Sequence, residues 1–303
     1  MNGPMTAEEI YEDLANFLQA SGDFRILRRL KPMQLQVQAN AGLTWQGVVV
    51  DVETTGLDAA EDEIIELAML PFRYDEAGRI VEVGEPWEGL RQPGKPIPPE
   101  AAVIHGLTDE KVAGRSIDPA EVARFIEPAD LIVAHNAGFD RPFLESFCAA
   151  FIAKPFGCSM TEIDWIGEGH EGFKLGYLAA DHGFFHDRHR ALNDCQATLG
   201  LLSRPMRTTG ILGMSALLSR ARQPTWRIWA EGAPFEFKDV LKRRGYRWRD
   251  GGAASLRAWY IDVSDEDRAG ELAYLEREIF GRPSPLVTHR LDARDRFSAR
   301  ALP

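Results

Sequence analysis

The 303-residue sequence predicts a mixed α/β domain followed by a smaller α+β module. The main domain is predicted because strand-like runs come first, and helical and strand patterns then alternate to about residue 203. A connection rich in Pro and Gly separates it from a second set of strands and helices. Apolar residues make up 45% of the chain and charged residues 27%, which excludes a disordered, collagen-like or fibrous protein.

The N-terminal residues 1–45 are expected to form a helical extension. Thr6 and Glu9 have the spacing of a capping box, and apolar residues then recur at helical spacing. We therefore predict a helix over residues 7–20 that packs against the rest of the protein. A second short helix is expected over residues 24–30, with its basic side chains solvated.

The main domain is expected over residues 46–204, beginning with the β-branched run Val48–Val50. Its other predicted elements are strands at 64–72, 80–87 and 131–134, a hairpin turn at 75–78, and helices at about 141–153 and 191–203. Together they indicate a mixed sheet flanked by helices.

The C-terminal part is expected to contain a linker, residues 205–222, and a small α+β module, residues 223–303. The linker is predicted to hold one short helix at 214–219. The module's predicted elements are strands at 226–230 and 256–263 and helices at 235–244 and 265–280. The tail after Pro283 is expected to be loosely held.

The net charge of −11 is unevenly distributed. Residues 223–303 contain 15 Lys and Arg against 13 Asp and Glu, a net charge of +2, which leaves −13 for residues 1–222. If nucleic acid is a ligand, metal ions or local basic patches must supply the attraction. Three cysteines without metal-ligand spacing, no secretory signal pattern and no apolar run long enough for a bilayer predict a cytoplasmic protein without membrane association.

Asp51 and Glu53 follow the apolar run of the first strand at positions i and i+2. The period-two alternation of a strand points both side chains to the same face. Carboxylates next to a core need compensation, and a divalent cation supplies it. A solvated strand end is the alternative interpretation of these two residues taken alone.

Two further carboxylates lie at the start of predicted helices. Asp140 follows the strand at 131–134, where Pro142 suits a first helical turn, so capping of the helix N-terminus is an alternative role for this residue. Asp194 opens the helix at 191–203, and His189 precedes it by just over one turn. Cys195, next in the chain, is expected to be a buried small side chain rather than a reactive thiol.

These segments resemble three motifs of the DEDDh family of 3′-to-5′ exonucleases, the family of the proofreading epsilon subunits of bacterial DNA polymerase III. The first motif appears as Val50–Leu57 (VDVETTGL), the second as Ala134–Asp140 (AHNAGFD) and the third as His189–Asp194 (HRALND). Residues 104–108 and 174–175 also look like recurrent family segments. The resemblance covers roughly residues 46 to 203 and implies a ribonuclease H-like fold.

The resemblance implies a role for each matching residue. Four carboxylates would hold two divalent cations, Mg²⁺ or Mn²⁺: Asp51, Glu53, Asp140 and Asp194. His189 would be the general base, and five residues would contact the terminal nucleotide: Thr54, Thr55, Gly56, Leu57 and Asn136. Leu57 could stack under a base or be an ordinary packed residue, and His105 could touch substrate or stabilise a turn. His170, His182 and His186 are expected to be surface loop residues.

The implied activity is hydrolysis of phosphodiester bonds from the 3′ end of nucleic acid, releasing nucleoside 5′-monophosphates by a two-metal-ion mechanism. The expected partner is a single-stranded 3′ end, and association with a polymerase follows by family analogy alone. A catalytically weak nucleic-acid-binding or scaffold protein with the same fold is the alternative. DNA or RNA preference, biological role and oligomeric state stay open.

The module contains four of the seven tryptophans, and residues 235–249 interleave basic and aromatic side chains. Such a surface can stack bases and neutralise phosphates, which would help to hold single-stranded nucleic acid. In the alternative interpretation, the basic side chains form only the solvent-exposed face of the module. The aromatic and aliphatic side chains are then a small core, made of Phe237, Leu241, Trp248 and Trp259.

Overall fold

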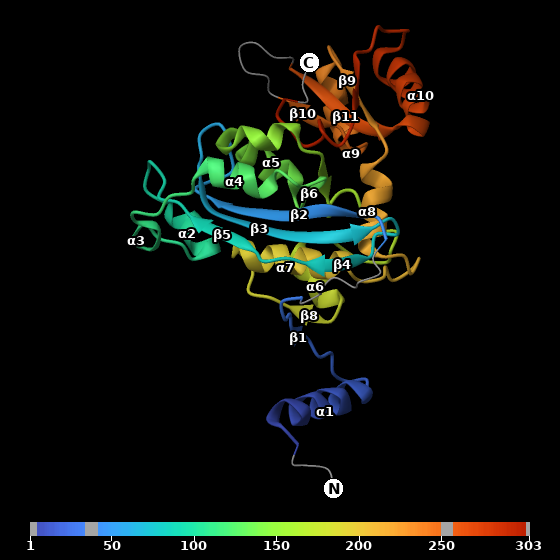
Figure 1. Cartoon of the computed structure of the whole chain (residues 1–303). Helices are drawn as coiled ribbons and strands as arrows, with labels where there is room; N and C mark the ends of the chain where they lie inside the picture. The colour runs from blue at the N-terminus through green and yellow to red at the C-terminus, as the bar shows by residue number, and fades with distance from the viewer. Residues whose placement is uncertain (1–4, 34–41, 250–256, 301–303) are drawn as a thin grey trace.

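The computed structural model describes residues 5–33, 42–249 and 257–300. A central sheet lies between two layers of helices, the C-terminal module covers one end of the molecule, and the first helix lies apart at the opposite end (Figure 1). The predicted mixed α/β architecture is therefore confirmed.

The main sheet has six strands in the order β4-β3-β2-β6-β7, with β5 also paired to β3. Strands β3, β4 and β5 run antiparallel to their neighbours, whereas β2, β6 and β7 are parallel. The strands are β2 (Thr44–Thr54), β3 (Ile64–Asp75), β4 (Ile80–Val83), β5 (Trp87–Leu90), β6 (Leu131–Ala134) and β7 (Phe156–Cys158). The helices of this domain are α2 (Pro99–His105), α3 (Asp109–Val112), α4 (Pro119–Ile126), α5 (Ala137–Phe147), the 3-10 helix η1 (Ala149–Ala153), α6 (Leu175–Asp181), α7 (Ala191–Leu202) and α8 (Gly213–Ala221).

The side chains of β2 alternate between two cores, as its sequence predicts. Val48 and Val50 pack with α4 and α5, whereas Val49 packs with α7 on the opposite face. The odd-numbered residues Asp51 and Glu53 thus belong to the α7 face of the sheet. This alternation brings the first motif to the helix that carries the third.

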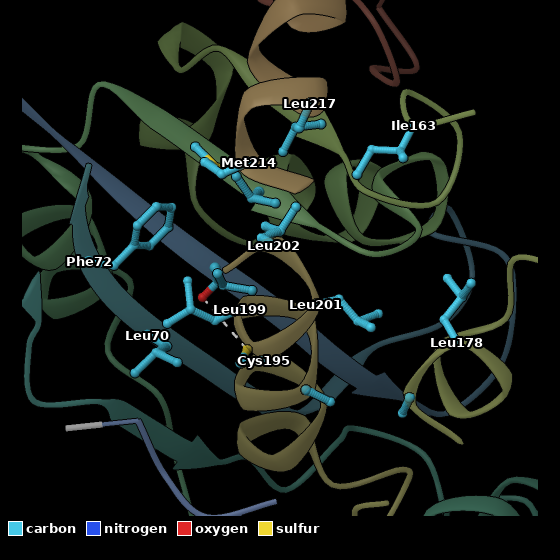
Figure 2. Packing of buried hydrophobic residues seen from close by; sticks show 14 of the residues in the cluster. Leu70, Phe72, Ile163, Leu178, Cys195, Leu199, Leu201, Leu202, Met214 and Leu217 are labelled. Carbon is cyan, nitrogen blue, oxygen red and sulfur yellow. Dashed lines mark hydrogen bonds between the residues drawn. The ribbon is translucent and has the colours of Figure 1, made fainter. Parts of the chain in front are cut away.

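Helix α7 is buried along most of its length against β2 and β3 (Figure 2). Leu199 and Leu70 belong to the same buried core, and the buried thiol of Cys195 donates to the Val49 carbonyl at 3.6 Å. Cys195 is therefore a packed side chain, as expected. Helix α8, which the sequence predicted as part of a linker, contributes Leu217 to the same core.

Two predicted boundaries in the main domain are wrong. The strand expected at 80–87 is two strands, β4 and β5, because the segment between them contains Gly84 and Pro86, and proline has no N–H for a ladder. Helix α5 begins at Ala137 instead of near residue 141, so Pro142 lies within the helix rather than in its first turn.

The N-terminal extension contains one correct and two wrong predictions. Helix α1 (Ala7–Ala20) has the expected capping box between Thr6 and Glu9, but none of its residues is buried. The helix predicted at 24–30 is absent from this described segment, where β1 (Arg28–Arg29) pairs with β8 (Phe184–Phe185) instead. That distant partner strand decides the conformation, and local spacing could not indicate it.

The C-terminal module is an antiparallel sheet of order β10-β11-β9-β12 with helices packed on it. Its core combines Ile228, Leu241 and Leu275, whereas Trp248, one of the predicted core residues, is 52% exposed. Part of the strand predicted at 256–263 lies outside the described residues. The elements are β9 (Thr225–Ala230), the 3-10 helix η2 (Phe235–Phe237), α9 (Lys238–Arg243), β10 (Arg247–Arg249), β11 (Ala258–Ser264), α10 (Asp265–Tyr274), the π-helix η3 (Leu275–Phe280) and β12 (Thr288–Leu291).

The described part of the tail after Pro283 is ordered, which corrects the expectation of a loosely held segment. After β12 the chain returns to the main domain, where the Phe156 N–H donates to the Ala293 carbonyl at 2.7 Å. The fully buried guanidinium of Arg141 donates to the carbonyls of Ala293 and Arg296 at 3.1 and 2.8 Å. We call residues 292–300 the returning strap. The buried guanidinium group of Arg141 thus holds the returning strap against the main domain. The composition of the tail could not predict this contact.

None of the helices in the described ranges is both long and apolar enough to cross a bilayer.

Candidate active site

The first two carboxylates lie at the end of β2, on the face that α7 covers. Strand β2 continues its pairing with β3 through Asp51 and Glu53, and its register then shifts before Thr54. One oxygen from each of Asp51, Glu53 and Asp194 lies within 4.8 Å of the others. Three of the four predicted carboxylates therefore form one compact acidic group.

Asp194 is held by the chain that precedes α7. One of its oxygens accepts the backbone N–H groups of His189 and Arg190 at 2.7 and 3.3 Å, and the other lies 2.8 Å from His186 Nε2. These three contacts orient the carboxylate at the first turn of α7.

Asp140, the fourth carboxylate, is buried in α5 and lies outside the compact group of three. Its Oδ1 accepts the backbone N–H of Val52, the residue between Asp51 and Glu53, at 3.3 Å. This contact ties α5 to the strand that carries the other acids. Because α5 begins at Ala137, Asp140 lies inside the helix and does not cap its N-terminus.

Burial and the charges of neighbouring acids raise the pKa values of three of these carboxylates, Asp51, Glu53 and Asp140. Burial first, and then the charges of Asp140 and Asp194, raise the pKa of Asp51 well above its ordinary value. Burial and the charge of Asp194 raise the pKa of Glu53 to about 8, and burial raises the pKa of Asp140 to about 7. Such mutual repulsion, in a set of hard oxygen donors, fits binding of divalent cations such as Mg²⁺ or Mn²⁺.

Glu66 is a residue of the site that the sequence prediction missed. It is 2% exposed and accepts hydrogen bonds from the guanidinium group of Arg190 at 2.9 Å and from the backbone N–H of Ala191 at 3.1 Å. Glu66 therefore fixes the N-terminus of α7 against β3. A single glutamate within the apolar strand of residues 64–70 was the signal that could have identified it.

His189 and His186 occupy different environments. His189 is exposed and has φ +60°, a left-handed conformation that non-glycine residues seldom adopt. The His186 side chain is only 4% exposed and contacts Asp194, so its predicted place in a surface loop is wrong. Both residues contact Asp194, His186 through its ring and His189 through its backbone N–H, and sequence spacing alone does not distinguish these two roles.

The other histidines are mostly structural. His105 is buried and its Nδ1 accepts the N–H of Leu107 at 3.0 Å, which favours the turn-stabilising interpretation. His170 is 3% exposed, lies 2.5 Å from Asp181 through Nδ1 and stacks on the partly buried His182, so neither is the predicted surface loop residue. In both, the ring turns inward against Trp165.

His135, in the second motif, was not predicted as a site residue. Its ring bridges Ser159 Oγ at 2.9 Å and the Phe173 carbonyl at 2.8 Å. Burial lowers the pKa of His135 to about 4, so the ring is neutral near pH 7. It therefore braces the loop that follows β6.

The predicted nucleotide-contacting residues divide into two groups. Thr54 and Thr55 are buried, and their hydroxyls donate to the Gly56 carbonyl and to Asp62 Oδ1 at 2.5 and 3.2 Å, so they shape the turn. At Gly56 a Cβ atom would lie 2.4 Å from Asp62 Oδ2, so a side chain there would displace the carboxylate that accepts from Thr55 and from the Asp58 N–H.

Leu57 and Asn136, in contrast, are exposed. Leu57 is 87% exposed, which removes the interpretation as an ordinary packed residue. Both line a cleft of about 780 Å³, whose other wall includes Arg247 and Arg300 of the C-terminal part. A cleft of this size accommodates a small organic group such as a nucleotide.

Comparisons with known proteins find similarity to exonucleases. The exonuclease family named RNase_T matches residues 48–202. The chain is 31% identical over 163 residues to the DNA polymerase III subunit epsilon of Treponema pallidum (strain Nichols), covering 50% of this chain and 73% of that protein. It is 33% identical over 178 residues to the uncharacterized exonuclease CP81 of Escherichia phage 186, covering 51% of this chain and 85% of that protein.

Among solved structures, exonuclease X in complex with 5′ overhanging duplex DNA aligns with a TM-score of 0.40 and 23% identity. That alignment covers 56% of this chain and 99% of the other.

Proposed function

The chain belongs to the RNase_T family of exonucleases, and from this premise we propose that it hydrolyses nucleic acid from the 3′ end, releasing nucleoside 5′-monophosphates. The observation that carries the proposal is the acidic group of Asp51, Glu53 and Asp194, with Asp140 bound to the adjacent backbone. The four carboxylates would hold two divalent cations, Mg²⁺ or Mn²⁺. When bound, these cations would lower the pKa of the attacking water and stabilise the departing 3′-oxygen.

The chain's own residues would position the reaction. Glu66 and Arg190 hold α7, and the N–H groups before α7 orient Asp194. His189 is the general base in this proposal, because its ring is exposed whereas the His186 ring is buried against Asp194. Its imidazole would accept the water proton as the new O–P bond forms. The bond from phosphorus to the 3′-oxygen then breaks, and that oxygen takes up a proton.

The substrate would enter past the exposed residues of the cleft. Leu57 would contact the terminal base and Asn136 the terminal nucleotide, whereas Thr54, Thr55 and Gly56 would contribute the shape of the turn. A single-stranded 3′ end is the proposed substrate.

The proposed exonuclease domain is residues 46–204, with residues 1–45 as an extension, 205–222 as a connection and 223–303 as a separate module. The family match at 48–202 and the module's own core support this division. Because α8 packs into the main core, the connection is structurally part of the exonuclease domain.

Cleavage of a 5′-labelled single-stranded oligonucleotide tests the activity. With Mg²⁺ or Mn²⁺ we expect a ladder that shortens from the 3′ end and disappears with a chelator, and matched DNA and RNA strands report the preferred sugar. Release of the label as a mononucleotide before any ladder forms would contradict the 3′ polarity. Binding without cleavage under every cation condition would favour the scaffold alternative.

Association with a polymerase is a further part of the proposal, supported by the relative named as a subunit of DNA polymerase III. Co-elution of the purified chain with the catalytic subunit of that polymerase in size-exclusion chromatography tests it. Separate elution at micromolar concentrations would contradict it.

A further inference from the structure

A second hollow, of about 550 Å³, lies where the C-terminal module meets the main domain. Five arginines from four separate segments line it: Arg220, Arg227, Arg247, Arg249 and Arg296. Glu162 and Asp262 are its acidic lining residues. We call this hollow the arginine groove.

The arginine groove is positive in a chain whose net charge is −11. Both acidic residues of the groove form ion pairs with arginines, since Arg227 Nε lies 2.7 Å from Asp262 and Arg296 Nε lies 3.1 Å from Glu162. Within the described ranges, Arg220, Arg247 and Arg249 form no ion pair. Three guanidinium groups therefore remain for an anionic ligand.

The positions of these guanidinium groups support this. Arg220 Nη1 is buried without a hydrogen-bond partner in the part of the chain that the structure describes. Burial first, and the charge of Arg227 second, lower the pKa of Arg249. The positive charges of Arg227 and Arg249 therefore repel each other in the groove, and a bound anion would relieve this repulsion. The fork of a guanidinium group matches the oxygens of a phosphate or a carboxylate, so anions of this kind fit the groove.

The arginine groove is continuous with the cleft of the candidate active site. Gly138, Pro142, Arg247 and Ala299 line both hollows, and Leu57 and Asn136, from the first and second motifs, also line the cleft. Leu57 and Asn136 belong to the motifs that carry the acidic residues, so a strand whose 3′ nucleotide lies at the acidic group would enter the cleft beside them and pass Arg247 into the groove.

Strand β10 separates the basic and aromatic side chains of the module. Arg247 and Arg249 share one face of β10, and the alternation places Trp248 on the other, against Trp259. The face turned to the groove therefore offers guanidinium groups, with Tyr260 from β11 beside them. This arrangement favours a phosphate backbone over stacked bases as the main ligand.

The two walls of the groove are held in a fixed relation. Arg296, in the returning strap, donates to the carbonyls of Ala221 and Gln223 at 2.5 and 2.8 Å, next to α8. Arg141 binds the same strap from the side of α5. The module is therefore docked in place before any ligand arrives, which lowers the entropic cost of binding.

We propose that the arginine groove binds the sugar-phosphate backbone of the single strand whose 3′ end lies at the acidic group, several nucleotides away from it. The inference rests on the proposed function for the position of the 3′ end. It assigns to the module a role in holding the substrate through Arg247 and Arg249, and not through the basic residues of α9.

The double variant Arg247→Gln/Arg249→Gln tests this, with Lys242→Gln/Arg243→Gln as the matched control. The control removes the same charge from the exposed face of α9, outside both hollows. Binding of 5′-fluorescein single strands of 3 to 20 nucleotides is followed by fluorescence anisotropy in a chelator. The melting temperature of each variant confirms that it is folded.

We expect the wild-type affinity to rise with strand length and then level off. The groove variant should bind the longest strands roughly tenfold more weakly or worse, and the slope of log K against log salt should fall by about 1.4, or about 0.7 for each lost phosphate contact. The control variant should keep the wild-type affinity and slope.

An unchanged affinity in the groove variant, or an equal loss in both variants, would overturn the proposal. An equal loss for a blunt duplex of the same length would show that the ligand is not a single strand, and would also overturn it. Hydrolysis of the p-nitrophenyl ester of thymidine 5′-monophosphate by the wild-type protein tests the acidic site separately. The two proposals are therefore tested separately. If the wild-type protein does not hydrolyse this ester, the proposed function fails, and the dependence of affinity on strand length still tests the groove.

Discussion

The imidazole Nε2 of His186 lies 2.8 Å from Oδ1 of Asp194, while the other oxygen of this carboxylate accepts the backbone N–H of His189 at 2.7 Å. Two histidines three residues apart thus serve Asp194 in different ways. One contributes its ring and the other its main chain, which leaves the His189 ring exposed.

Loss of the His186 ring should weaken cation binding. In His186→Phe the ring volume is kept but Asp194 loses a hydrogen-bond partner, so we expect the affinity for Mn²⁺ to fall about 10- to 100-fold. Isothermal titration calorimetry measures this. Arg188→Gln, in the same loop, is the control, because removing a positive charge cannot weaken the attraction for a cation. Equal affinities in His186→Phe and the wild type would contradict the prediction.

Loss of the His189 ring should slow turnover while binding persists. We expect His189→Ala to reduce kcat by roughly 10² or more. His189→Asn separates chemistry from conformation, because asparagine tolerates the left-handed backbone observed at this position (φ +60°). Single-turnover cleavage and strand binding measure the two effects. A near-normal rate in His189→Asn would remove the ring from the mechanism.

Without cations, the protein should become less stable as the pH rises. The pKa of Asp140 is raised from 3.8 to about 7 and that of Glu53 from 4.5 to about 8, so between pH 4 and 8 the folded protein holds protons that the unfolded chain has released. The free energy of unfolding therefore falls across this window. Melting curves in a chelator from pH 5 to 9 measure it, and a flat or rising Tm would contradict it.

Neutralising one carboxylate should stabilise the cation-free protein. Asp140→Asn keeps an oxygen to accept the Val52 N–H but removes a repelling charge, so at pH 8 we expect Tm to rise by about 2–4 °C for each kcal/mol of relieved repulsion. The stabilisation that Mn²⁺ gives the wild type should shrink in this variant. Glu76→Gln, in the exposed turn after β3, is the control and should change neither quantity. A lower Tm for Asp140→Asn at pH 8 would show that repulsion is not the dominant effect.

The sequence predicted the features that depend on local spacing. The period-two alternation of β2 correctly placed Asp51 and Glu53 on one face, and the strand Leu131–Ala134 matches residue for residue. The capping box at Thr6 is also as predicted.

The features that sequence reasoning missed depend on distant partners. Strand β1 forms because β8 lies beside it, and Glu66 belongs to the site because Arg190 and Ala191 reach it across the sheet. The His186 ring is buried because it contacts Asp194, eight residues further along the chain. No periodicity encodes these contacts, since each joins segments whose proximity exists only in the folded chain.

The returning strap makes the stability of the exonuclease domain depend on residues outside it. Cleavage of the chain near residue 223, followed by loss of the strap, would strand the Arg141 guanidinium in a protein interior without the carbonyl groups that solvate it. We therefore expect heating to melt nuclease and module in one calorimetric peak, and proteolytic removal of the module to yield an aggregation-prone remnant rather than a minimal enzyme.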